Sequence, residues 1–171
     1  PRSTLFPYTT LFRSGRRQVT GFVFPGDFLG TKAAGPSAYT AEALEPGLVC
    51  RFSHGFLDEM SARHPGIKDR LIARAETELS RAQTHIVVLG KQTAEERVIS
   101  FLRLMRDARK GRDRDEARIF LPMARQDIAD YLGLRLETLS RTLAALKKAG
   151  TLTEVSGRFV DMGSRFETAA G

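Results

Sequence analysis

Residues 125–143 read RQDIADYLGLRLETLSRTL, and this stretch decides the fold. Gly133 stands between two runs of helical periodicity, at a position where a sharp turn usually requires positive φ. The apolar residues expected to pack the two helices together are Ile128, Leu132, Leu134, Leu139 and Leu143, with small Ala129 at the closest approach. The second helix is expected to run from about Leu136 to Ala149, where Gly150 is a stop signal. The stretch therefore predicts a helix-turn-helix.

Three polar residues share one face near the start of the second helix. Glu137, Ser140 and Arg141 lie at positions i, i+3 and i+4, which are neighbours on a helix surface. Arginine can donate two hydrogen bonds to guanine, a carboxylate can accept one from cytosine, and a hydroxyl can do either. We therefore expect these residues to read base edges in the major groove of DNA. The alternative is a solvated helix face with an incidental ion pair.

Basic and hydroxyl side chains around this helix are candidates for contacts with the DNA backbone. Residues 152–160 predict two short strands that turn at Ser156-Gly157, the shape of a wing. The expected backbone contacts are Arg125, Arg135, Thr138, Lys147, Lys148 and Arg158, the last at the tip of the wing. For Lys147 and Lys148 an equal alternative is that they are the cations expected near a helix C-terminus.

A long helix is predicted further upstream, over residues 67–92. Its apolar residues recur at alternating steps of three and four, as in the seam of a coiled coil. They are Ile72, Ala75, Leu79, Ala82, Ile86 and Leu89. A stripe this narrow suits a partner helix, so we expect a dimerisation helix; the alternative is a helix packed on its own domain. A second helix over residues 93–108, a charged loop over 109–118 and a short strand over 119–122 are expected to follow.

The N-terminal part predicts the end of an antiparallel sheet. Residues 18–24 alternate in part, Pro25-Gly26-Asp27 is a strong turn, and residues 38–52 offer two further short strands. About 38 residues cannot bury a sheet on both faces, so further strands are expected to complete its core. Residues 1–14 resemble a translated sequencing adapter and are expected to be non-native, so they are left out of fold reasoning. The alternative is a natural strand rich in threonine and phenylalanine.

Composition and charge limit the class of protein. The 171 residues carry a formal net charge of +7, and the chain stays basic without the two arginines of the first segment, which suits a nucleic-acid partner. No apolar run approaches the roughly 18 residues of a membrane span, so no membrane partner is expected. The single cysteine excludes an intrachain disulfide framework and fits a reducing cytosol. An enzyme is not expected, because paired carboxylates and phosphate loops are missing and His54, His64 and His85 are isolated.

Three groups of motifs resemble the Crp/Fnr family. They are PGDFLG at 25–30, AEERVISFL at 94–102, and LPMARQDIA at 121–129 followed by ETLSR at 137–141. The resemblance covers almost everything after residue 15, in the family's order. It implies an α+β chain with part of a cyclic-nucleotide-binding-type β-roll, a long dimerisation helix and a C-terminal winged helix-turn-helix. It also implies a cytoplasmic homodimer that binds a pseudo-palindromic promoter site on double-stranded DNA and contacts RNA polymerase.

The resemblance also divides the chain and narrows its branch. Residues 15–66 are expected to be a remnant of the β-roll sensor domain, 67–92 the dimerisation helix, and 93–171 the winged helix-turn-helix domain. The Glu-x-x-Ser-Arg pattern resembles the Fnr/FixK branch, whereas Leu136 stands where the cyclic-AMP-responsive branch has a further arginine. This implies half-sites of the TTGAT kind and control by oxygen, redox state or nitrogen metabolism. Ala124 departs from the family's hydroxyl residue, and the missing N-cap costs about 1 kcal/mol.

Two features concern the signal that the protein senses. From Thr31 to Val49 the only basic residue is Lys32, so a cyclic-nucleotide phosphate would lack its charged partner and cyclic AMP is not expected as a ligand. Cys50 resembles the internal cluster ligand of oxygen-sensing Fnr proteins, but one thiolate cannot hold an iron-sulfur cluster. No cofactor is therefore expected in this chain; a cluster in a full-length protein and a small buried apolar role for Cys50 are the open alternatives. The alternative function is a nucleotide-responsive signalling module that does not bind DNA.

Overall fold

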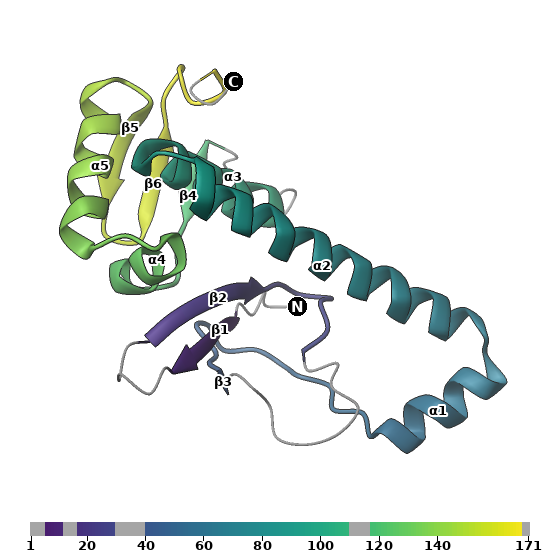
Figure 1. Cartoon of the computed structure of the whole chain (residues 1–171). Helices are drawn as coiled ribbons and strands as arrows, with labels where there is room; N and C mark the ends of the chain where they lie inside the picture. The colour runs from purple at the N-terminus through teal and green to yellow at the C-terminus, as the bar shows by residue number, and fades with distance from the viewer. Residues whose placement is uncertain (1–5, 12–16, 30–39, 110–116, 169–171) are drawn as a thin grey trace.

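The computed structural model describes residues 6–11, 17–29, 40–109 and 117–168, which form an N-terminal and a C-terminal part joined by a long helix (Figure 1). The N-terminal part contains β1 (Phe6–Leu11), β2 (Arg17–Val23) and β3 (Thr40–Ala41). Helices α1 (His54–Arg63) and α2 (Gly66–Lys91) follow. The C-terminal part consists of α3 (Ala94–Arg109), β4 (Arg118–Phe120), α4 (Arg125–Leu132), α5 (Leu136–Lys148), β5 (Leu152–Ser156) and β6 (Phe159–Met162). The predicted α+β architecture is confirmed, while most of the predicted charged loop lies outside the described residues.

The N-terminal sheet has the strand order β2-β1-β3, and both pairs are antiparallel. The predicted strand and turn are confirmed at the end of β2. There the backbone N–H of Asp27 donates to the Phe24 carbonyl oxygen at 2.9 Å, across a turn in which Gly26 has φ +90°. Strand β1 lies in the middle of the sheet, so residues 6–11 take part in the fold, contrary to the expectation. Its non-native origin stays a prediction, because strand pairing does not depend on where a segment comes from.

The two short strands predicted in residues 38–52 are reduced to one in the described part of that range. Strand β3 has two residues, and Leu48 further along is 98% exposed. The prediction of a second strand is wrong, because a strand must pair its backbone groups with a neighbouring strand. β2 and β3 are the edges of this sheet, and residues 42–52 pair with neither of them.

Helix α2 has 26 residues, none of them buried. The predicted seam faces solvent: Leu79 is 59% and Ile86 69% exposed, Ile72, Ala75 and Ala82 are also exposed, and Leu89 is half-buried. Other positions on the helix meet the rest of the chain. The Arg81 guanidinium donates to the Asp27 carboxylate at 2.9 Å, and the His85 ring stacks on Tyr131 with centroids 4.0 Å apart. The seam from Ile72 to Ile86 is therefore not used for packing among the described residues, and only Leu89 at its end meets the rest of the chain.

The hydrophobic core lies in the C-terminal part, between its helices and its sheet, whose strand order is β4-β6-β5. Val98, Phe101 and Leu102 of α3 are among its most deeply buried residues. Strand β2 adds Phe22, whose ring lies 5.9 Å from that of Phe101 and 5.1 Å from that of Tyr131. The N-terminal sheet is therefore anchored on α3 and α4 by an aromatic contact.

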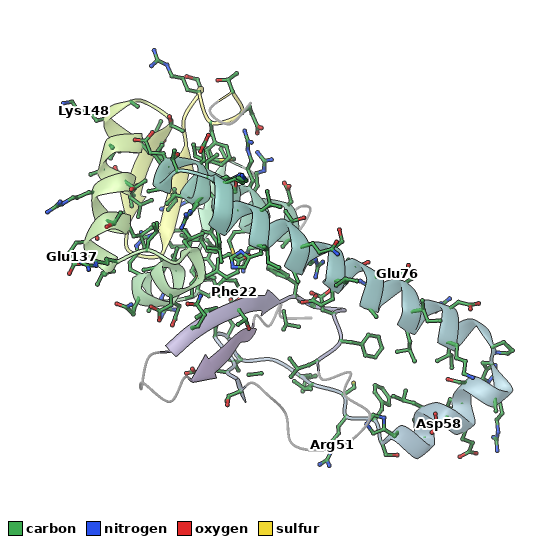
Figure 2. All side chains as sticks on the ribbon, viewed as in Figure 1. Phe22, Arg51, Asp58, Glu76, Glu137 and Lys148 are labelled. Atoms are coloured by element: carbon green, nitrogen blue, oxygen red, sulfur yellow. The ribbon has the colours of Figure 1, made fainter. Side chains whose placement is uncertain are left out.

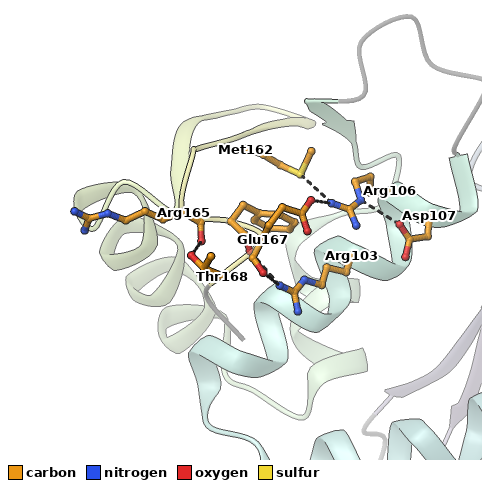
Figure 3. Close-up of polar contacts among 8 residues, drawn as sticks. Arg103, Arg106, Asp107, Met162, Arg165, Glu167 and Thr168 are labelled. Carbon is orange, nitrogen blue, oxygen red and sulfur yellow. Dashed lines mark hydrogen bonds and ion pairs between the residues drawn. The ribbon is translucent and has the colours of Figure 1, made fainter. Parts of the chain in front are cut away.

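The C-terminal segment after β6 is fastened to α3 by arginines (Figure 3). Phe166 is 1% exposed, and the guanidinium groups of Arg103 and Arg106 lie 5.8 and 5.7 Å from its ring centroid. Arg103 also donates to the carbonyl oxygens of Phe166, at 3.2 Å, and Glu167, at 2.8 Å. Arg106 forms an ion pair with the Glu167 carboxylate. This segment closes one side of the core, a role that the periodicity of the sequence does not indicate.

Candidate nucleic-acid interface

The helix-turn-helix is formed by α4 and α5. Gly133 ends α4 in the left-handed conformation, with φ +62°, and the backbone N–H of Leu134 then donates to the Ala129 carbonyl oxygen at 2.9 Å. The predicted contacts between the helices are confirmed, because Ile128, Ala129, Leu132, Leu139 and Leu143 are all buried and Leu134 is half-buried. Gly133 is needed here, since side chains strongly disfavour this backbone conformation.

The three expected base-reading residues lie on the outer side of α5. Its buried residues are Leu139, Thr142, Leu143 and Leu146, which leave the opposite stripe open. Glu137, Ser140 and Arg141 are exposed, and none of them bonds to another described residue. Figure 2 shows Glu137 and Lys148 at opposite ends of the helix. The ion pair of the alternative does not form with any described residue, while a solvated face and a base-reading face both stay open for these three side chains.

The expected backbone contacts divide into free and occupied side chains. Arg135, Thr138, Lys148 and Arg158 are exposed and make no ion pair with described residues. Lys147 instead binds the Glu154 carboxylate on β5 at 3.0 Å, and this hydrogen bond lowers the pKa of Glu154. A phosphate can bind the exposed cations directly, whereas at Lys147 it must compete with the Glu154 carboxylate.

Arg125 connects the start of α4 to the wing. One terminal nitrogen of its guanidinium donates to the Gly157 carbonyl oxygen at 3.1 Å, and the other is buried without a partner among the described residues. Burial lowers the pKa of Arg125. The half-buried side chain therefore positions the tip of the wing against α4, and a phosphate contact through it stays a prediction.

The N-terminus of α4 keeps half of a capping box. Ala124 has no side-chain acceptor, but its backbone N–H donates to the Asp127 carboxylate at 3.1 Å. Asp127 is buried, so this interaction replaces part of what the missing hydroxyl would supply.

Restoring the hydroxyl should stabilise the domain. Ala124→Ser completes the reciprocal pair and is expected to raise the free energy of unfolding by about 0.5–2 kcal/mol. Urea denaturation followed by circular dichroism measures the change. Ala144→Ser, in the exposed middle of α5, is the matched control, because it adds a hydroxyl where no free backbone N–H awaits it. No gain over this control would mean that Asp127 already satisfies the helix end.

A titratable pair lies where α2 meets α4. Burial raises the pKa of Tyr131 to about 12, with the Glu78 carboxylate adding to the shift and Arg81 opposing it. Burial also lowers the pKa of His85, and a hydrogen bond to the Tyr131 backbone opposes the shift in part. A histidine with a lowered pKa is held neutral in the folded protein, so its protonation opposes folding.

The contact between His85 and Tyr131 should make stability depend on pH. Its full contribution is present above the unfolded pKa of 6.5 and is lost as the pH falls through that value towards the lowered folded pKa. Unfolding in urea at pH 7.5 and pH 5.5 measures the difference, about one unit on either side of the histidine value. His85→Gln should reduce it, with the exposed His64→Gln as control. Equal pH dependence in His85→Gln and the parent would contradict this role.

The structure describes the surroundings of Cys50 but only part of the expected sensor region. Cys50 is exposed, so the alternative of a small buried apolar residue is wrong. No group of three or more histidine, cysteine or acidic residues in the described ranges could hold a metal ion, and a cluster in a full-length protein with Cys50 as one ligand stays a prediction. Residues 30–39, on which most of the argument against cyclic AMP rests, lie outside the described part. None of the helices described is long and apolar enough to cross a membrane.

Comparisons with known proteins agree with this geometry. The Crp-like helix-turn-helix domain matches residues 96–162. The nitrogen fixation regulation protein FixK of Bradyrhizobium diazoefficiens is 39% identical over 147 residues, which are 86% of this chain and 62% of that protein. FixK of Rhizobium meliloti is 38% identical over 152 residues, 89% of this chain and 67% of that protein.

The same relationship holds in three dimensions. The structure of FixK2 from Bradyrhizobium japonicum superposes with a TM-score of 0.82 at 29% identity and covers 99% of this chain and 87% of that one. The chain spans about three fifths of the length of the first curated relatives it matches. The shared domain, the level of identity and the shared fold together show that the chain belongs to the Crp/Fnr family, in its FixK branch.

Proposed function

We propose that the protein is a sequence-specific, DNA-binding transcriptional regulator. The observation that carries the proposal is the exposed, unpaired triplet Glu137, Ser140 and Arg141 on a helix whose opposite face is buried. The named relatives regulate nitrogen fixation, which supports a role in nitrogen or anaerobic metabolism. The resemblance supports half-sites of the TTGAT kind, action in the cytoplasm and a contact with RNA polymerase.

The active form in this proposal is a homodimer on a two-fold-symmetric site. The exposed seam of α2 supports it, because a row of isoleucine, leucine and alanine facing water gains free energy when a second copy covers it. Small Ala75 and Ala82 in the row allow two helices to approach closely. A two-fold axis along α2 would present two copies of α5 to two half-sites.

A gel-shift titration tests the function. The probes are a symmetric duplex with two TTGAT-type half-sites and a scrambled duplex of the same composition, each at rising salt. Specific binding predicts a clear preference for the symmetric duplex that persists as salt weakens both complexes. Equal affinity for the two probes at every salt concentration would contradict sequence-specific binding.

Shortening one seam residue should weaken the dimer. Burying a leucine side chain contributes about 1.5–3 kcal/mol, of which alanine keeps a part. A homodimer loses the side chain twice, so Leu79→Ala is expected to raise the dimer dissociation constant about a hundredfold, which corresponds to about 2.8 kcal/mol. Sedimentation equilibrium measures it, with Ser80→Ala, exposed on the same helix but outside the seam, as the control. A dissociation constant that both variants leave unchanged would place the dimer interface elsewhere.

A further inference from the structure

Arg97, near the start of α3, joins three segments by hydrogen bonds to main-chain oxygens. Its Nε donates to the Gln92 carbonyl at 3.0 Å, one terminal nitrogen to the Leu89 carbonyl at 2.7 Å, and the other to the Leu132 carbonyl at 3.0 Å. Leu89 and Gln92 belong to the end of α2, and Leu132 is the last residue of α4. A single half-buried guanidinium therefore holds the ends of two helices.

The chemistry of these three oxygens explains why an arginine stands here. The last carbonyls of a helix lack partners within it and carry the negative end of the helix dipole. A guanidinium offers five donors in a planar fork and stays charged, so it can satisfy several carbonyls at once. A lysine ammonium is a compact charge on a flexible stem and lacks this fixed fork.

The connection between α2 and α3 is short and fixed on both sides of Arg97. The Glu96 carboxylate accepts from the backbone N–H of Thr93 at 2.7 Å, and the Thr93 hydroxyl accepts from the backbone N–H of Glu96 at 3.4 Å. The Ser100 hydroxyl donates to the Gln92 side-chain oxygen at 3.0 Å. With its local backbone held in this way, Arg97 has a defined direction towards α4.

The turn of the helix-turn-helix also lies directly against the end of α2. A Cβ built on Gly133 would lie 3.4 Å from a methyl carbon of Leu89 and 3.7 Å from Arg97 Nη1. The turn that positions α5 is therefore in contact with both the dimerisation helix and the guanidinium that holds it.

We infer that Arg97 is a positioning residue that fixes the direction of α2 relative to the recognition helix α5, and thereby the half-site spacing that a dimer accepts. The effect on half-site spacing rests on the proposed function. The role of Arg97 in fixing α2 relative to α5 does not depend on it. Arg97 extends from the core helix α3, whose buried residues include Val98, Phe101 and Leu102, so we expect the helix to stay packed when the guanidinium is removed. Loss of Arg97 should therefore release α2 and leave the DNA-binding domain folded.

The distance between two spin labels tests the structural part directly. The labels are attached at Ser80→Cys on α2 and Ala144→Cys on α5, both exposed, in the full chain with Cys50→Ser. With the doubly labelled chain diluted in an excess of unlabelled chain, so that only distances within one subunit are measured, pulsed electron spin resonance should give one narrow distance distribution in the parent and a broader or shifted one in Arg97→Gln. Arg97→Lys keeps the charge but not the planar fork, so its distance distribution should be intermediate in width. It is also the deciding variant if Arg97→Gln does not fold.

Arg103→Gln is the matched control. Arg103 lies on the same helix and also donates to main-chain oxygens, but those of Phe166 and Glu167 belong to the DNA-binding domain itself. Its replacement should leave the distance distribution narrow. If folded Arg97→Gln and Arg97→Lys keep the parent's distribution, the inference is overturned, whatever the protein does with DNA.

Gel shifts on symmetric duplexes whose half-sites are moved by one or two base pairs test the consequence. The parent and Arg103→Gln should prefer one spacing, and Arg97→Gln should lose that preference while it still binds a single half-site. If the parent binds none of the duplexes, the proposed function is refuted. The spin-label distances then still test whether Arg97 fixes α2 relative to α5. A parent preference that Arg97→Gln retains refutes the role of Arg97 in spacing.

Discussion

Arg141→Ala should weaken binding to the symmetric site by about 1–3 kcal/mol for each half-site and relax the base preference there. Arg141 is exposed on the free face of α5 and carries no ion pair with the described residues, so its guanidinium can form two hydrogen bonds with a guanine edge. A dimer loses this interaction twice. Gel-shift titration at constant salt against the TTGAT-type duplex and single-base variants measures both effects.

Lys148→Ala is the matched control for Arg141. Lys148 lies at the far end of the same helix, is also exposed and makes no ion pair with the described residues, so it is suited to a phosphate and not to a base. Its loss should weaken binding to the specific and the scrambled duplex alike. It should also reduce the slope of the logarithm of affinity against the logarithm of salt concentration by about one. If Arg141→Ala lowered the affinity for both duplexes equally, Arg141 would not be a base-reading residue.

The elements that sequence predicts well are those with local signals. The long helix is predicted over residues 67–92 and runs over Gly66–Lys91, because its periodic apolar pattern extends from Ile72 to Leu89, over most of the 26 residues. The recognition helix ends close to the predicted residue because Gly150 takes φ +75° just beyond it. The orientation of Glu137, Ser140 and Arg141 also follows from spacing alone, since a helix repeats every 3.6 residues.

The features that sequence does not predict depend on contacts between distant residues. Arg125 was expected to face phosphate, but the wing tip that it holds lies 32 positions away in the chain. Arg97 belongs to a motif that indicates the family, yet the carbonyls that define its role become visible only when two helix ends meet. The strand predicted beyond β3 failed for the converse reason: its own pattern was suitable, but no described strand lies beside it.

Phe166 is the clearest example of a residue that matters through long-range packing. Its side chain is 1% exposed and lies below two arginines of α3 that stand 63 and 60 positions earlier in the chain. Phe166→Ala removes the ring, leaves a cavity beside α3 and deprives both guanidinium groups of the aromatic face. The expected loss in the free energy of unfolding is about 3–5 kcal/mol. Urea denaturation followed by circular dichroism measures it.

Phe159→Ala is the control that separates burial from residue type. Phe159 is also in the C-terminal part and also lies below an arginine, with the Arg118 guanidinium 4.4 Å from its ring centroid, but its side chain is 39% exposed. Because the ring already meets water, its removal should cost clearly less than that of Phe166. Similar losses for both variants would mean that the segment after β6 does not close the core. A loss below about 1 kcal/mol for Phe166→Ala would mean the same, because buried aromatic rings cost several times more to remove.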